Sequence, residues 1–87
     1  MHADIKKKSL RRLSLIRGQV DGLTKMIHAE RYCVDIIIQV SAVKEALSGV
    51  EDLVLENHLT THVIQQIKDG KEKKATQEIL KVYKLAQ

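Results

Sequence analysis

The sequence predicts an all-α fold with three helices per chain, in a single domain over residues 1–87. The chain has no proline and only four glycines, and it is rich in residues that favour long helices. Its aliphatic residues recur at spacings of three and four, the period of an amphipathic helix. A chain of 87 residues without Phe or Trp buries only a small core. We therefore expect a homo-oligomer with extended contacts between helices.

The first helix is expected from about Asp4 to His28, because one face of this segment is apolar throughout. Most of its basic residues fall off that face, and a connection over residues 29–31 follows. The apolar positions are Leu13, Ile16, Val20, Leu23 and Ile27.

The second helix is expected to begin near Tyr32, and its apolar pattern continues through Ile67. Gly49 lies inside the pattern at a cost of about 1 kcal/mol relative to alanine, which burial of its neighbours can offset. Gly70 can adopt the left-handed conformation that ends a helix. A helix this long does not fit a lone compact domain, so we expect antiparallel pairing with a second chain. A short amphipathic helix over residues 72–85 completes the chain.

The net charge of +4 is unevenly distributed: residues 1–28 carry +5, residues 29–70 carry −4, and residues 71–87 carry +3. Basic ends indicate a polyanionic partner such as nucleic acid, although lysine-rich helices are also common for solubility alone. A single cysteine and the absence of a signal-peptide pattern favour a reducing, cytoplasmic location. No segment is long and apolar enough to predict a membrane span.

Cys33, His58 and His62 form a candidate metal site. The two histidines are four residues apart and therefore share a helix face, and sulfur with two imidazoles suits Cu(I), Zn(II), Ni(II) or Co(II). The ordinary alternatives are two surface histidines and a small buried cysteine. On one continuous helix Cys33 and His58 are about 37 Å apart, so either the helix breaks or two chains share the site. An antiparallel pair of second helices would form two equivalent sites.

The remaining histidines, His2 and His28, are expected to be surface residues, with His2 an optional extra ligand. A catalytic Cys–His pair would need an orienting carboxylate and an oxyanion donor, and no motif supplies them. The sequence therefore argues against an enzyme.

Three stretches resemble the copper-sensitive operon repressor family (CsoR/RcnR-like), which also contains nickel/cobalt and formaldehyde sensors. They are RLSLIRGQVDGL at 12–23, RYCVDIIIQVSAVKEAL at 31–47 and LENHLTTH at 55–62. The resemblance covers nearly the whole chain. It implies an antiparallel four-helix-bundle homodimer that assembles further into a homotetramer, as a dimer of dimers. It also implies a repressor that holds double-stranded operator DNA when metal-free and releases it when metal binds.

The resemblance assigns the ligand positions to Cys33, His58 and His62. Many copper sensors of the family have a second cysteine at the third position, whereas the nickel/cobalt branch and some copper sensors have histidine. Tyr32 and Glu78 match the residues that, in copper sensors, form hydrogen bonds around the ligand histidine, and they favour Cu(I).

For DNA contact, Arg12 and Lys44 match basic positions of the family. Leu15 stands where a basic residue is usual and Arg17 where an acid is usual, which indicates a rearranged electropositive surface.

Three alternatives stay open. A Ni(II)/Co(II)-responsive repressor would complete a six-coordinate site with His2 or the N-terminal amine. A metal-buffering or chaperone protein would have no DNA role. A purely structural helical assembly would bind no metal tightly.

Overall fold

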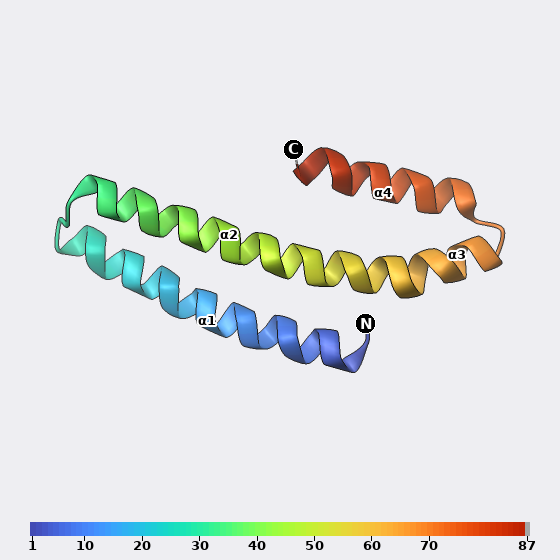
Figure 1. Cartoon of the computed structure of the whole chain (residues 1–87), viewed down its shortest axis with the longest axis horizontal. Coiled ribbons are helices and arrows are strands. Elements are labelled where there is room, and N and C mark those ends of the chain that lie inside the picture. The colour runs from blue at the N-terminus through green and yellow to red at the C-terminus, as the bar shows by residue number, and fades with distance from the viewer. Residues whose placement is uncertain (87) are drawn as a thin grey trace. The chain divides into compact units, whose positions relative to one another are not determined.

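The computed structural model describes residues 1–86, with side chains to Leu85, and every element in this range is helical. The elements are α1 (Ala3–His28), α2 (Cys33–His58), η1 (Leu59–Val63), α3 (Ile64–Lys68) and α4 (Glu72–Ala86) (Figure 1). Because α2, η1 and α3 follow one another without a gap, they correspond to the long second helix expected from the sequence. The all-α, three-helix fold is thus confirmed. Among the described residues, no helix combines the length and apolarity that crossing a bilayer requires.

The chain groups into two compact units, Met1–Leu55 and Glu56–Gln87. A single functional domain over residues 1–87, whose last residue lies outside the described range, stays a prediction.

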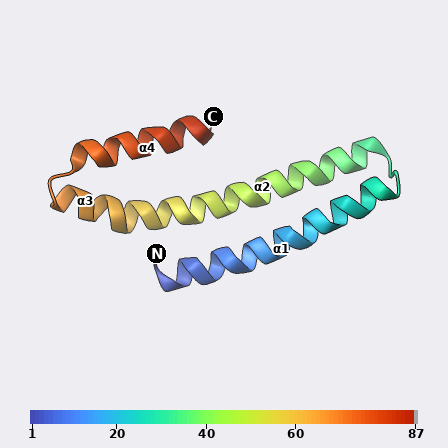
Figure 2. The same ribbon diagram turned by 180° about the vertical axis from the view of Figure 1, so that it is seen from behind.

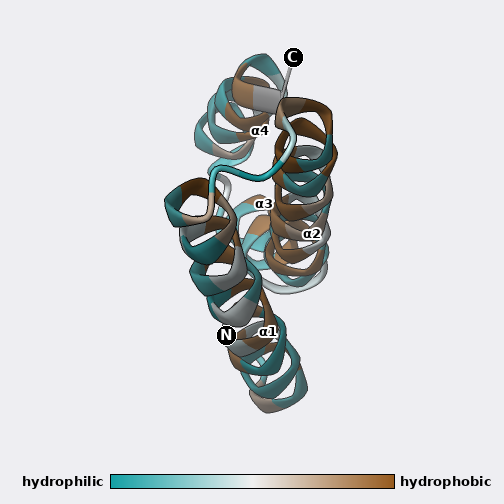
Figure 3. Cartoon of the chain, turned by 90° about the vertical axis from the view of Figure 1, so that its left-hand side faces the viewer, coloured by the Kyte–Doolittle hydropathy of each residue, from teal (hydrophilic) through white to brown (hydrophobic). Residues whose placement is uncertain are grey.

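The first unit is a helical hairpin in which α1 and the first part of α2 run side by side in opposite directions (Figures 1 and 2). Ile16 and Val43 are its buried apolar side chains, 6% and 7% exposed. Other apolar positions of α1, such as Val20 and Ile27, keep 44% and 61% of their surface exposed. Two helices cover only one strip of each other, so much of the apolar surface faces outward. Coloured by hydropathy, the helices carry both apolar and polar segments (Figure 3).

The connection after α1 ends that helix with a left-handed residue. Glu30 has φ 49°, its amide donates to the Ile27 carbonyl at 3.0 Å, and the Arg31 amide donates to the Met26 carbonyl at 3.0 Å. This pair of hydrogen bonds is the Schellman motif, in which glycine usually occupies the left-handed position. The expected connection over residues 29–31 is confirmed. Glu30 occupies its left-handed position, although this conformation is unfavourable for a residue with a Cβ.

The second unit consists of the end of α2, η1, α3 and α4, with α4 following α3 through a short connection (Figure 2). Its buried side chains are Asn57, Val63 and Ala75. The connection uses the same motif as the first: Gly70 has φ 73° and its amide donates to the Ile67 carbonyl at 3.1 Å. The expected helix stop at Gly70 is confirmed.

The two connections generate opposite predictions for stability. Gly70→Ala should lower the free energy of unfolding by about 1 kcal/mol, because a Cβ disfavours the left-handed conformation. Glu30→Gly should raise the free energy of unfolding by about 1 kcal/mol, because glycine has no Cβ that disfavours the left-handed conformation. Denaturant unfolding of both variants at equal protein concentration measures the two effects. Changes of the same sign in both variants would contradict this explanation of the caps.

Candidate functional site

The imidazoles of His58 and His62 lie next to each other in the second unit. Their ring centroids are 5.3 Å apart and the ring planes are tilted by 45°. His58 is the last residue of α2, and His62 belongs to η1, a single π-helical turn. Such turns inside α-helices frequently occur at functional sites.

Two threonines between the histidines bond to the backbone of the preceding turn. The Thr60 hydroxyl donates to the Glu56 carbonyl at 2.9 Å and to the Asn57 carbonyl at 3.3 Å. The Thr61 hydroxyl donates to the Asn57 carbonyl at 2.6 Å. Neither threonine is among the site residues that the sequence predicts. The signal that could have found them is the pair of adjacent hydroxyl residues between two histidines, since threonine in a helix often bonds back to a carbonyl.

Glu78 of α4 lies beside His58. Its Oε2 atom is 3.5 Å from Nε2 of His58, with the side chains of His58 and Glu78 28% and 39% exposed. The same oxygen accepts a hydrogen bond from Nε2 of Gln66 at 3.5 Å. A carboxylate at one ring nitrogen of a histidine favours a proton there and leaves the other nitrogen, Nδ1, available to a metal. Gln66 is a further residue that the sequence does not single out, and its own Oε1 is buried without a partner.

The donor chemistry of this pair fits a soft or borderline metal ion. Two neighbouring imidazoles can each offer one nitrogen to a shared ion, with bonds of about 2 Å. Within the described part of the chain, however, no group of three or more His, Cys, Asp or Glu side chains gathers into a metal site. A metal held by this histidine pair with three ligands would require a further donor from outside this cluster.

Cys33 is the first residue of α2, in the first unit, and its thiol is exposed. Tyr32 precedes it with 70% of its surface exposed, and the Tyr32 carbonyl accepts hydrogen bonds from the Asp35 and Ile36 amides. An exposed thiol at the start of a helix is accessible to a second molecule.

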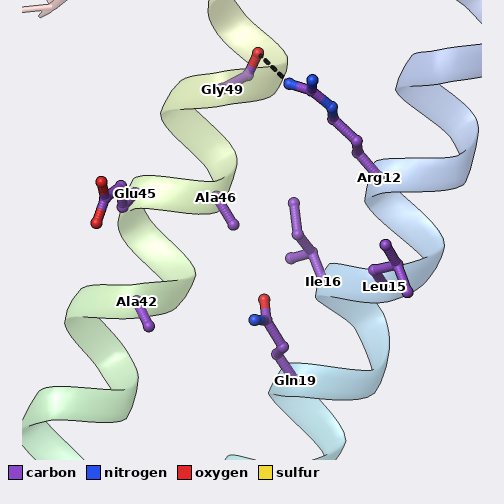
Figure 4. A pocket seen from close by; sticks show the side chains of 8 residues that line it. All are labelled: Arg12, Leu15, Ile16, Gln19, Ala42, Glu45, Ala46 and Gly49. Carbon is purple, nitrogen blue, oxygen red and sulfur yellow. Dashed lines mark hydrogen bonds between the residues drawn. The ribbon is translucent and has the colours of Figure 1, made fainter.

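Arg12 of α1 reaches across to α2. Its Nη1 atom donates to the Gly49 carbonyl at 3.4 Å (Figure 4). A Cβ at position 49 would lie 3.3 Å from this nitrogen, so glycine allows the close approach of the guanidinium. An alanine there would require a shift of this flexible side chain by only a few tenths of an ångström.

A shallow groove between α1 and α2 adjoins this contact (Figure 4). Leu15, which the resemblance places where a basic residue is usual, lines the groove, and Arg17 and Lys44 are exposed. The lining residues are Arg12, Leu15, Ile16, Gln19, Ala42, Glu45, Ala46 and Gly49.

His2 and His28 lie at opposite ends of α1. The Nδ1 atom of His2 accepts a hydrogen bond from the Asp4 amide at 3.2 Å and so caps the start of the helix. His28 is the last residue of α1 and is exposed. A basic side chain there complements the helix dipole.

Known proteins resemble this chain over almost its whole length. The Bacillus subtilis copper-sensing transcriptional repressor CsoR is 44% identical over 73 residues, covering 84% of this chain and 72% of that protein. CsoR from Mycobacterium tuberculosis (strain H37Rv) is 35% identical over 79 residues, covering 91% of this chain and 66% of that protein.

A solved structure shares the fold. The crystal structure of the copper-sensing repressor CsoR with Cu(I) from Geobacillus thermodenitrificans NG80-2 superimposes with a TM-score of 0.90 at 34% identity. The match covers 100% of this chain and 92% of that chain. Residues 5–84 also match the sequence profile described as metal-sensitive transcriptional repressor. The chain belongs to the metal-sensitive transcriptional repressor family.

Proposed function

We propose that this protein is a Cu(I)-responsive transcriptional repressor that binds operator DNA when metal-free and releases it when Cu(I) binds. The observation that carries the proposal is the His58–His62 pair with Glu78 at its edge, in a chain similar to a repressor crystallised with Cu(I). We further propose that residues 1–87 act as one sensing domain in the cytoplasm. A reducing compartment keeps the single thiol available as a ligand.

Cu(I) suits this site better than Ni(II) or Co(II). Cu(I) prefers few and soft ligands, whereas Ni(II) requires additional nitrogen and oxygen donors. His2 is the candidate that the sequence offers for such a donor, and its Nδ1 already caps α1. A thiolate with two imidazoles meets the needs of Cu(I) without His2.

The proposed site combines Cys33 of one chain with His58 and His62 of another. Cys33 and His58 are the first and last residues of α2, a single unbroken helix of 26 residues. The rise of 1.5 Å per residue separates the ends of such a helix by about 37 Å. An antiparallel pair of α2 helices would bring the start of one beside the end of the other. A homodimer then holds two sites, and two dimers would form the homotetramer.

Arg12, Arg17 and Lys44 are the proposed DNA contacts. They belong to the first unit, and Arg17 and Lys44 make no ion pair within the described residues. Their charge is therefore available for phosphate oxygens, which supply most of the affinity in such interfaces.

Thermodynamic linkage relates the release of DNA to the binding of metal. An ion that weakens DNA binding must bind the DNA-free form more tightly by the same factor. A Cu(I) ion held by Cys33 of one chain and by His58 and His62 of another would fix the register of the two α2 helices. His58 then transmits its position through Nε2 to Glu78 on α4.

The experiment that tests the function is DNA binding by the metal-free protein under reducing conditions. We expect tight, salt-dependent binding to an operator duplex and release by Cu(I) at lower concentrations than by Ni(II), Co(II) or Zn(II). Preferential release by Ni(II) or Co(II) would support the nickel/cobalt alternative. Cu(I) binding without any DNA binding would support a buffering protein.

Mixed dimers test the shared site. One Cys33→Ala chain and one His58→Ala chain, purified together with two affinity tags, should bind one Cu(I) per dimer. In that dimer, Cys33 of the second chain still faces both histidines of the first. A site within each chain would leave no intact site at all. The wild-type dimer, with two Cu(I), and each homodimeric variant, with none, are the controls.

Glu78→Ala and Tyr32→Phe test the route of the signal. Both variants should still bind Cu(I) but show metal-induced DNA release that is weaker by a factor of roughly 5–150, the range of typical allosteric coupling. The measurement is operator affinity with and without saturating Cu(I). Release by both variants equal to that of the wild type would leave the helix register as the only route.

Salt dependence tests the DNA surface. Arg12→Ala and Lys44→Ala should each weaken operator binding and flatten the log–log salt dependence by about 0.9 for each phosphate that the variant no longer neutralises. Lys68→Ala, which replaces an exposed lysine of α3, is the matched control and should change neither quantity. Unchanged affinity and slope in the first two variants would assign DNA binding to another surface.

A further inference from the structure

The π turn between the two histidines coincides with an unusual pair of hydrogen bonds. In an α-helix, the amides of Thr60 and Thr61 would donate to the carbonyls of Glu56 and Asn57, four residues earlier. Here the hydroxyls of the same two threonines donate to those two carbonyls, at 2.9 Å and 2.6 Å. These two carbonyls belong to the last turn of α2, directly before η1, so both hydroxyls tie the start of the π turn to the end of the preceding helix.

Single threonines elsewhere in the chain make similar hydrogen bonds without a π turn. Thr24 bonds to the Val20 carbonyl at 3.2 Å and Thr76 to the Glu72 carbonyl at 2.9 Å, each four residues back. Both lie within ordinary α-helix, in α1 and α4. What distinguishes Thr60 and Thr61 is that two adjacent hydroxyls act on two consecutive carbonyls. One such back-bond tends to bend a helix, and here two in succession coincide with the π turn.

The turn they stabilise determines the relative position of the imidazoles. It begins directly after His58 and contains His62, and the two rings are 5.3 Å apart. Returning the segment to α-helical geometry would rotate His62 and every later residue relative to His58. Gln66, which bonds to Glu78, is among those later residues.

We propose that Thr60 and Thr61 are positioning residues whose hydroxyls hold the π turn and thereby set the spacing of His58 and His62 for the metal. The inference rests on the proposed function for its metal-binding consequence only. The π turn itself is a property of the metal-free chain.

The test compares three full-length variants. Thr60→Val with Thr61→Val removes both hydroxyls but keeps the branched shape of the side chains. Thr60→Ser with Thr61→Ser keeps both hydroxyls and removes only the methyl groups. Thr76→Val removes an equivalent back-bond from an ordinary helix.

The first measurement uses metal-free protein, with NMR or a crystal structure reporting the backbone hydrogen bonds of residues 59–66. The double-valine variant should show α-helical bonds in this segment, and the other two should keep the π turn. A π turn that persists in the double-valine variant overturns the proposal. This result does not depend on whether the protein binds copper.

The second measurement is Cu(I) affinity by competition with a chromophoric Cu(I) chelator. The double-valine variant should bind about tenfold more weakly, within the 10–100-fold loss typical when groups that orient metal ligands are removed. The double-serine and Thr76→Val variants should have the Cu(I) affinity of the wild type. In the absence of metal, all three variants should bind DNA with wild-type affinity. Loss of the π turn with unchanged Cu(I) affinity would overturn the positioning role. Failure of the wild type to bind Cu(I) would instead overturn the proposed function.

Discussion

The uninterrupted length of α2 is the constraint on which the rest of the molecule depends. A helix is a rigid spacer, and 26 residues keep Cys33 and His58 at its opposite ends. No rearrangement of side chains can bring a thiol and an imidazole across that distance. In the proposed site, a metal that needs both residues would therefore be shared between two chains, and the rigid helix would transmit a bond at one end along its whole length.

The exposed apolar surface independently favours pairing with a second chain. In the hairpin of the first unit, only Ile16 and Val43 are buried apolar side chains, while Ile37 and Ile38 keep 63% and 62% of their surface exposed. Burial contributes about 25 cal/mol per Å² of apolar surface, so leaving such residues in water gives up much of the free energy that stabilises a short chain. A second chain that covers this surface would stabilise the hairpin and would supply the missing ligand at the same time.

Periodic features could be read from the sequence, and local irregularities could not. Helix ends such as Gly70 and the shared face of His58 and His62 follow from spacing and residue type alone. Glu30 in a left-handed conformation does not, because the hydrogen bonds of the Glu30 and Arg31 amides override the preference of the side chain. The contact between Arg12 and Gly49 joins residues 37 positions apart and depends on how two helices pack. The π turn likewise coincides with two hydroxyl bonds that single-residue propensities do not express.

In the proposed mechanism, Glu78 reports the position of His58. Its Oε2 contacts both His58 and Gln66 at 3.5 Å, the long limit for such bonds, so both contacts can shorten when the imidazole is fixed. One hydrogen bond contributes about 0.5–1.5 kcal/mol net. That is of the order of the 1–3 kcal/mol by which allosteric sites are typically coupled. Because Oε1 of Gln66 is buried without a partner, a shift of this side chain also changes how well a buried acceptor is satisfied. In the proposed mechanism, a small movement of the His58 ring would therefore bias α4.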